Sequence, residues 1–373
     1  MLLRTGYIIG RLREVRREVT QSYNGVAVHS AEEMRECYRE PGIVSGYRKN
    51  YSVSQVVLSL FQSNNETVNF WTHFLPSLYF LWNFISLSST MSVFSDPYLY
   101  PLACHLVTSC TYPLASCLAH AFSCISPKAT YVCFFLDYAA LSLYSWGTSV
   151  LYFAYTFPVS SFSGFYSASF LPVAAVNAVL ATFFACGSRF VENQRLVKIL
   201  RLGAYIVPFV WDSIPLVYRL ITCDTETDSC ERSMPYHLVQ FASVFAASFF
   251  YASHIPERFA PGRFDFVGNS HNLLHLFGII ATHEQIRGAI VDLTYRKEFL
   301  QKINWVVHPA WVVVVTPVVL ILNLIIIITS VSLLNKVEPF CNDSTLAFHG
   351  QQRVNDRERC SQISAEDDKQ KQH

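Results

Sequence analysis

Trp311-Val-Val-Val-Val-Thr-Pro-Val-Val-Leu-Ile-Leu-Asn-Leu-Ile-Ile-Ile-Ile328 is the plainest apolar run in the chain, and no charged residue interrupts it. A helix of about twenty apolar residues can cross the hydrocarbon core of a bilayer, so this run predicts a membrane-spanning helix. Composition agrees, because 51% of the 373 residues are hydrophobic and only 15% are charged. Soluble domains carry about a quarter charged residues. The sequence therefore indicates an integral membrane protein.

Other apolar tracts of similar length precede this run. Together they predict an all-α, polytopic membrane helix bundle, with a seven-helix core and an eighth C-terminal span. Helices are expected because the backbone polar groups of a segment in lipid must be hydrogen-bonded within that segment. The predicted spans are, in chain order, Val68–Ser89, Leu99–Cys124, Tyr131–Phe157, Phe165–Cys186, Leu202–Ile221, His237–Ser253, His271–Ile290 and Val306–Leu334.

The chain divides into three predicted regions. Residues 1–67 form an arginine-rich cytosolic arm, residues 68–334 form the transmembrane bundle, and residues 335–373 form a polar, disordered tail. The first 67 residues contain no apolar run long enough for the core of a signal peptide, so the first span is expected to direct insertion. A net charge of +1 gives no indication of nucleic-acid binding.

Loop charges predict the orientation. The arm and the loops after the fourth and sixth spans are basic, whereas the loop after the fifth span is acidic. Because basic residues accumulate on the cytosolic side of membrane proteins, the amino terminus is expected in the cytosol. One loop disagrees, since its basic residues would face outward. These residues, after the seventh span, are Arg287, Arg296, Lys297 and Lys302.

The chain has eleven cysteines, and most of them fall in apolar segments. In such segments cysteine behaves as a small hydrophobic residue. Only Cys223 and Cys230 flank a polar loop as a possible disulfide pair. The sequence leaves open whether they are bonded.

Polar side chains inside predicted spans are costly, and they commonly mark function. His271 and His275 begin the seventh span with i, i+4 spacing, which places both on one face of a helix. Such a pair can bind a metal ion, but the spacing is common in helices and does not establish one. His120 ends the second span one turn after Ser116, and Asp137 begins the third.

The number of membrane crossings between these residues places them at one face. Two crossings separate the start of the first span from the end of the second, and four separate the start of the third from the start of the seventh. An even number of crossings returns the chain to the same side, so all of these residues are expected at the cytosolic face. The start of the first span adds three residues that share a helical face and form a predicted supporting network: Glu66, Asn69 and His73.

A zinc site is the chemical prediction from this set. His120, His271 and His275 would supply three imidazoles and leave a fourth position open, as catalytic zinc sites do. Asp137 and Ser116 are expected to hydrogen-bond a metal-bound water or to orient a ligating imidazole. A zinc-bound water, whose pKa falls towards 7, can attack a lipid amide or ester.

Structural roles are the alternative for residues taken alone. Ser116 alone would usually hydrogen-bond its own helix, and His73 alone fits a core histidine. Asp212, between Pro208 and Pro215, is expected to cap a broken turn. Five further histidines lie near span ends without evident partners and are predicted to be structural: His105, His237, His254, His283 and His308.

Several separated motifs resemble the progestin and adipoQ receptor family. The resemblance covers roughly residues 40 to 335, and the motifs occur in the family's order. It is strongest to the membrane progestin receptor branch, of the delta and gamma type. The matching stretches are Gly42-Ile-Val-Ser-Gly-Tyr-Arg48, Asn65-Glu-Thr-Val-Asn-Phe-Trp-Thr-His73, Ser116-Cys-Leu-Ala-His-Ala-Phe122, Phe135-Leu-Asp-Tyr138 and the segment from Pro256 to His275.

The resemblance implies a seven-helix core with a cytosolic amino terminus. The adiponectin receptor branch holds zinc with three histidines, has a serine and an aspartate nearby, and is associated with ceramidase activity. The matching positions here are His120, His271, His275, Ser116 and Asp137. The progestin branch implies a plasma-membrane receptor whose ligand is a steroid or another lipid and which signals through a heterotrimeric G protein.

Two functions therefore follow from the resemblance and the residues together. One is a progestin receptor that mediates rapid, non-genomic signalling. The alternative is a zinc-dependent intramembrane lipid hydrolase, a ceramidase-like amidase. The sequence does not separate them, because a metal held by three histidines can be catalytic or structural, and it identifies no ligand-binding residues.

Overall fold

The computed structural model describes residues 26–336, apart from residues 92, 159–163, 224–229 and 335. The first 25 residues, including the first part of the predicted arm, lie outside the described residues. So does almost all of the predicted disordered tail.

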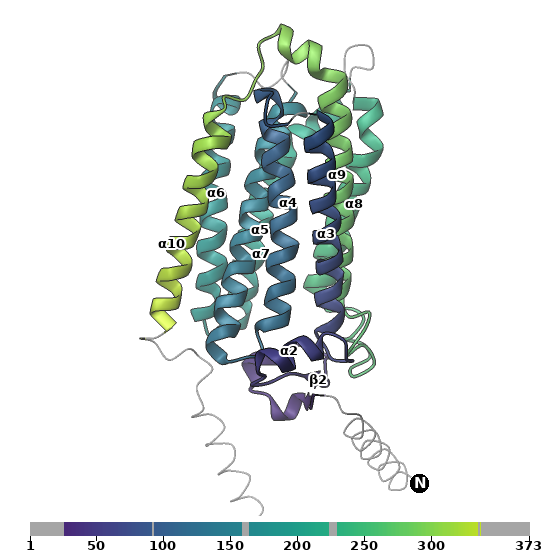
Figure 1. Cartoon of the computed structure of the whole chain (residues 1–373), viewed down its shortest axis with the longest axis vertical. Coiled ribbons are helices and arrows are strands. Elements are labelled where there is room, and N and C mark those ends of the chain that lie inside the picture. Colours follow the sequence, from purple (N-terminus) through teal and green to yellow (C-terminus); the bar gives the residue numbers. More distant parts are fainter. Residues whose placement is uncertain (1–25, 92, 159–163, 224–229, 335, 337–373) are drawn as a thin grey trace, which may run out of the picture.

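Long helices dominate the described part of the chain and run side by side in one elongated bundle (Figure 1). Each coincides with a predicted span, so the chain is an all-α polytopic membrane protein. Within the residues that the structure describes, four segments combine the length and apolarity of a membrane crossing: Pro97–Phe122, Phe165–Phe190, Arg195–Ile221 and Trp311–Leu334. The long helices are α3 (Thr67–Met91), α4 (Tyr100–Phe122), α5 (Pro127–Tyr155), α6 (Phe165–Gly187), α7 (Gln194–Ile221), α8 (Cys230–Ser253), α9 (Ser270–Lys302) and α10 (Thr316–Leu334).

The helix α10 lies at the outer edge of the bundle, where it packs against α5 and α6 (Figure 1). Its side chains are apolar and largely exposed; Ile328, for example, is 64% exposed. Exposed apolar side chains of this kind suit contact with lipid. One five-residue π-helical turn, Trp311–Val315, leads into α10. The eighth helix thus adds to a core made by α3 to α9.

Short elements cover the end of the bundle from which the chain starts (Figure 1). The strands β1 (His29–Ser30) and β2 (Ser45–Tyr47) pair antiparallel, and α2 (Val53–Ser59) follows with a capping box between Ser52 and Gln55. The remaining short helices are η1 (Ala31–Glu33), η2 (Glu36–Tyr38), η3 (Pro97–Leu99) and η4 (Ser188–Phe190).

The loop between α8 and α9 ties this amino-terminal segment to the bundle. Both carboxylate oxygens of Asp265 accept hydrogen bonds from the backbone N–H groups of Val44 and Ser45, at 3.0 and 2.9 Å. Gly42 has a φ of +80°, and a Cβ there would lie 2.6 Å from the carbonyl oxygen of Glu257. Only glycine allows this close approach of the two segments.

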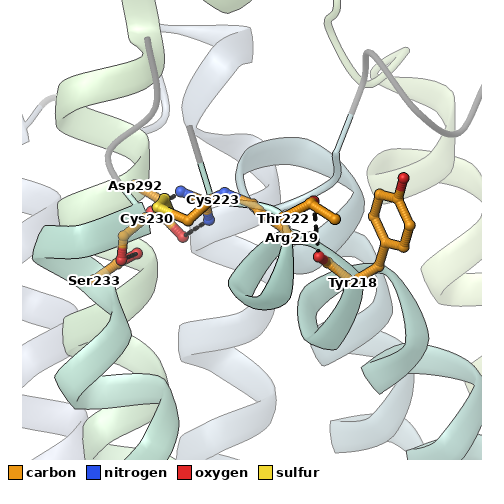
Figure 2. Close-up of a disulfide and its surroundings, with 7 residues drawn as sticks. All are labelled: Tyr218, Arg219, Thr222, Cys223, Cys230, Ser233 and Asp292. Atoms are coloured by element: carbon orange, nitrogen blue, oxygen red, sulfur yellow. Dashed lines mark hydrogen bonds and ion pairs between the residues drawn. A yellow bond between two sulfur atoms is a disulfide. The ribbon is translucent and has the colours of Figure 1, made fainter. Parts of the chain in front are cut away.

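At the opposite end, Cys223 and Cys230 form a disulfide that links the end of α7 to the start of α8 (Figure 2). The possible pairing is therefore observed. Disulfides form on the oxidising side of a membrane. This agrees with the predicted outward orientation of the acidic loop between the two cysteines.

A buried ion pair lies beside the disulfide (Figure 2). Arg219 donates two hydrogen bonds to Asp292, at 2.6 and 2.7 Å, and His237 Nε2 lies 3.2 Å from the same carboxylate. The expectation that His237 lacks a partner was therefore wrong. His283 also has a partner, because its Nδ1 lies 2.8 Å from the Tyr79 hydroxyl.

Two of the four basic residues that disagreed with the predicted orientation, Arg296 and Lys297, have partners within the bundle. Arg296 is buried and donates to the carbonyl oxygens of Tyr155 and Phe157, at the end of α5. Lys297 pairs with Asp96 at 3.2 Å. These contacts also explain why α9 extends to Lys302 rather than ending at the predicted Ile290.

The helix α7 continues through both of its internal prolines, Pro208 and Pro215. Asp212 therefore does not cap a broken turn, and that expectation was wrong. Its carboxylate is buried and accepts a hydrogen bond of 2.7 Å from the Ser149 hydroxyl of α5. Asp212 thus joins two helices inside the bundle.

Candidate functional site

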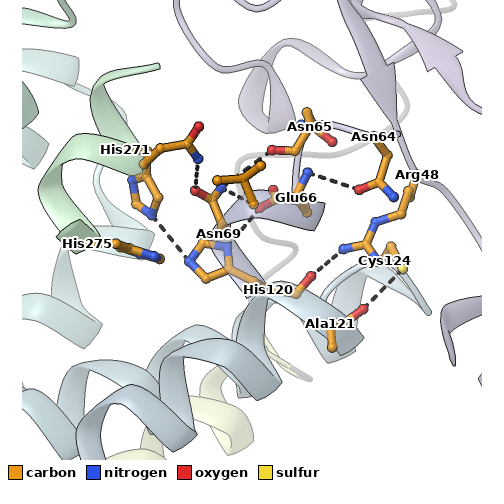
Figure 3. Close-up of polar contacts among 12 residues, drawn as sticks. Arg48, Asn64, Asn65, Glu66, Asn69, His120, Ala121, Cys124, His271 and His275 are labelled. Carbon is orange, nitrogen blue, oxygen red and sulfur yellow. Dashed lines mark hydrogen bonds and ion pairs between the residues drawn. The ribbon is translucent and has the colours of Figure 1, made fainter. Parts of the chain in front are cut away.

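Three histidine side chains converge at the end of the bundle that carries the amino-terminal segment (Figure 3). His120 comes from the last turn of α4, while His271 and His275 come from the first turns of α9. One candidate ligand nitrogen from each lies within 4.8 Å of the others. His120 and His275 are 3% and 4% exposed, and His271 is half-buried.

Local sequence sets the start of α9 and with it the direction of both histidines. The side chain of Asn269 accepts a hydrogen bond of 2.9 Å from the backbone N–H of Asn272, which caps the helix. A capped start fixes where the first turn begins. With their i, i+4 spacing, His271 and His275 then face the same neighbours.

Two of the three imidazoles are held through the ring nitrogen that points away from the cluster. His120 Nδ1 lies 2.8 Å from the Glu66 carboxylate, and His275 Nδ1 lies 3.1 Å from the Thr72 hydroxyl. Each contact leaves Nε2 directed at the cluster, where His120 Nε2 and His271 Nε2 are 3.2 Å apart. Metal-ligating histidines are oriented in this way by a partner on the second nitrogen.

The predicted supporting network lies directly around the cluster. Asn69 donates to Glu66 at 2.8 Å and accepts from Asn272 at 2.6 Å, which links α3 to α9. The ring of His73 stacks on that of His275 with centroids 3.6 Å apart. His73 Nδ1 has no hydrogen-bond partner within the described residues.

Asp137 and Ser116 also lie together at this end of the bundle. Ser116 is buried and interacts electrostatically with Asp137. Asp137 lines the same cavity as His120 and His271. The structure therefore brings every predicted site residue to one end of the bundle, as the crossing argument expects.

A cavity of about 720 Å³ opens beside the histidines. Its walls come from the amino-terminal segment, the end of α4, the starts of α5 and α7, the end of α8 and the start of α9. Glu40 lines this cavity and interacts electrostatically with Glu66, Arg189 and Arg201. Small-molecule sites commonly measure about 300–1,000 Å³.

A second, shallower groove faces outward between α3 and α9. Its volume is about 380 Å³, and its lining is apolar apart from Thr72. Thr72 is the residue that contacts His275 Nδ1, so this groove lies one side chain away from the cluster. The other lining residues are Val68, Trp71, Leu75, Pro76, Leu276 and Ile279.

The sequence interpretation missed three residues that hold the cluster. Thr72 orients His275, Asn272 anchors Asn69, and Arg48 donates to the carbonyl oxygen of His120 and to the Ser59 hydroxyl. Thr72 and Asn272 are next to the predicted site residues His73 and His271, and Arg48 ends the motif that begins at Gly42. Their partners come from other segments, so spacing along the chain carries no sign of these roles.

Comparison with known proteins identifies relatives over most of the bundle. Residues 61–286 match the family model described as haemolysin-III related. The chain is 45% identical over 269 residues to membrane progestin receptor delta of Homo sapiens, covering 70% of this chain and 77% of that protein. It is 42% identical over 272 residues to membrane progestin receptor gamma of Mus musculus, covering 72% and 82%. Membrane progestin receptor alpha-B of Danio rerio is 31% identical over 273 residues, covering 72% and 77%.

Proposed function

Because the chain belongs to the haemolysin-III related family of multi-pass membrane proteins, we propose that it is a plasma-membrane receptor for progestin-type steroids. One observation carries the proposal: the identity of 41–45% to relatives named membrane progestin receptors gamma and delta in mammals, over about seven-tenths of the chain. The match includes the helices that build the cavity.

The cavity supports a small-molecule ligand. Its volume of about 720 Å³ suits such a ligand, and its wall includes the rings of Tyr131, Phe134 and Tyr138. Flat aromatic surfaces pack well against a flat, fused-ring steroid. For signalling, we propose a heterotrimeric G protein as partner at the predicted cytosolic end, where the basic loops lie.

A zinc ion at the histidine cluster is a further part of the proposal. Nitrogen ligands at about 2.0 Å from a tetrahedral zinc ion are about 3.3 Å apart. The separation of 3.2 Å between His120 Nε2 and His271 Nε2 fits this value. The acidic partner of His120, Glu66, is also of the type that accompanies ligating histidines. His120, His271 and His275 would hold the ion.

A second candidate function, a lipid amidase, is favoured by the position of Asp137. When bound at three histidines, zinc supplies a water of lowered pKa. Asp137, in the cavity wall with His120 and His271, would hold the proton that such a water loses. The names of the relatives favour the receptor, so the amidase remains the second candidate.

The test compares wild-type protein with His275→Ala in the same purified, full-length preparation. Saturable binding of labelled progesterone, zinc content and release of fatty acid from ceramide are measured side by side. His308→Ala, an exposed histidine far from the cluster, serves as the control. We expect saturable steroid binding by the wild-type protein. We also expect about one zinc ion per chain, which His275→Ala loses and the control keeps.

Each outcome bears on a different proposal. Wild-type protein without saturable steroid binding would contradict the receptor. Wild-type protein without zinc would contradict the metal site. Ceramide hydrolysis that disappears with the metal, while steroid binding persists, would establish a catalytic site separate from recognition.

A further inference from the structure

Two arginine side chains converge on one tyrosine ring in the cavity wall. Arg189 lies in η4 and Arg201 in the second turn of α7, and their guanidinium carbons are 5.7 and 6.0 Å from the centroid of Tyr138. Arg189 also lies 4.7 Å over the ring of Phe134. Cation–π contacts of this kind hold the two charges in place, on the wall that α5 provides.

Hydrogen bonds fix one edge of each guanidinium and leave other donors available. Arg189 Nε and Nη2 donate to the Tyr138 hydroxyl at 3.1 and 2.8 Å. Arg201 Nε donates to the Ser188 hydroxyl at 2.9 Å. Within the described residues, neither arginine forms an ion pair with a carboxylate. Both are therefore positioned cations with unused N–H groups.

The cavity as a whole also has an excess of positive charge. Seven Arg or Lys side chains line it, against four Asp or Glu side chains. Lys198 is among the seven and lies one turn before Arg201 on α7. Like charges held close together repel one another, and the repulsion grows as protein replaces water around them. An anion bound between them would relieve it.

Ordinary enrichment of basic residues on the cytosolic side does not explain this placement. Arg195 stands on the same helix as Arg201, is exposed, and does not line the cavity. Its position is that of an ordinary surface charge. Arg189 and Arg201 are instead half-buried and line the interior of the cavity.

We propose that Arg189 and Arg201, with Lys198, bind a phosphate group in this cavity, carried by an amphipathic lipid. Arginine guanidinium groups match phosphate oxygens in charge and in the geometry of paired hydrogen bonds. Two or three cations suit a phosphate monoester, which carries close to two negative charges. An uncharged steroid makes no use of these charged groups, although the rings of Phe134 and Tyr138 border both proposed sites in the one cavity.

The test measures binding of three probes to the purified full-length protein in phosphatidylcholine nanodiscs. Dioctanoyl phosphatidic acid carries the phosphate on an apolar tail, dioctanoylglycerol has the same tail without the phosphate, and inorganic phosphate has no tail. We expect phosphatidic acid to bind most tightly. Arg201→Gln should weaken its binding about tenfold or more, because it removes charge-assisted hydrogen bonds. Binding of dioctanoylglycerol should not change.

Arg195→Gln is the matched control, since it removes the same charge from the same helix outside the cavity. Equal weakening by Arg195→Gln and Arg201→Gln would reduce the effect to general surface attraction and overturn the proposal. Equal affinity for phosphatidic acid and dioctanoylglycerol would also overturn it. If inorganic phosphate binds as tightly as the lipid and depends on Arg201 in the same way, the anion site exists but its ligand is free phosphate, and the lipid part of the proposal is wrong.

Two further variants keep the test decisive if Arg201→Gln does not fold. Arg201→Lys keeps the charge but loses the paired hydrogen bonds, so we expect an intermediate loss of affinity. Lys198→Gln removes the exposed charge beside the site and should weaken phosphatidic acid binding while thermal stability stays unchanged. Wild-type affinity in both variants would contradict the site.

Discussion

The orientation of His120 depends on a single carboxylate. Glu66 Oε2 lies 2.8 Å from His120 Nδ1 and also accepts from Asn69. This contact keeps the proton on Nδ1 and leaves Nε2 free to face His271. Glu66 thus holds the His120 ring, while Arg48 holds the His120 backbone.

Replacing Glu66 with Gln should weaken zinc binding about 10- to 100-fold. A carboxylate that accepts the Nδ1 proton makes the imidazole a stronger ligand for the metal than a neutral amide does. Competition with a zinc chelator on the purified protein measures the affinity. Glu298→Gln, an exposed residue on the same helix as His271, is the control and should have no effect. If Glu66→Gln binds zinc with the affinity of the wild type, the contact between Glu66 and His120 does not contribute to metal binding.

Buried polar side chains follow one side of α9 over most of its length. Between His275 and Asp292 lie Thr282, which bonds Tyr112 of α4, and Gln285, which bonds hydroxyl groups on α5. All four residues are buried. The distance from His275 to Asp292 is about 25 Å along a helix, compared with a hydrocarbon thickness of about 30 Å. The stripe therefore extends through most of the membrane interior.

The stripe ends at the ion pair of Asp292 and Arg219, which are 0% and 2% exposed. Asp292→Ala would leave a buried arginine without its counter-charge and should cost about 3–5 kcal/mol of folding free energy. Thermal unfolding in detergent, followed with wild-type protein in parallel, measures the loss.

The double variant Arg219→Leu, Asp292→Leu provides the comparison for that prediction. It removes both charges, so we expect it to be more stable than Asp292→Ala, since no unpaired charge remains. If the single and double variants unfold at the same temperature, the cost comes from packing and not from the unpaired arginine.

The same helix shows where prediction from sequence succeeds and where it fails. The apolar part of α9 and its paired histidines are visible in the sequence, and crossing parity placed them with His120. The predicted span ends at Ile290, three turns too early, because the polar residues His283, Glu284 and Arg287 come before that point. The charges of Asp292 and Arg296 are satisfied by Arg219 and by carbonyl oxygens of α5, and such partners from distant segments leave no pattern along the chain.

Over the whole molecule, charge divides between the two ends of the bundle. The end with the histidine cluster has the basic cavity, and the opposite end has the Cys223–Cys230 disulfide with the acidic stretch between its cysteines. The positive-inside rule places the basic end in the cytosol and the acidic stretch between Cys223 and Cys230 outside. Of the four basic residues that disagreed with this orientation, Arg296 and Lys297 are paired inside the bundle.

This orientation predicts which epitopes antibodies can reach on intact cells. A short tag inserted between Asp224 and Ser229 should be labelled without permeabilisation, whereas a tag before Met1 should be labelled only after it. Both tagged proteins must first show wild-type thermal stability, so that loss of labelling is not loss of folding. Labelling of the amino-terminal tag on intact cells would reverse the orientation. The basic cavity would then open to the extracellular side, and a cytosolic G protein could not contact the end of the bundle that holds the histidines.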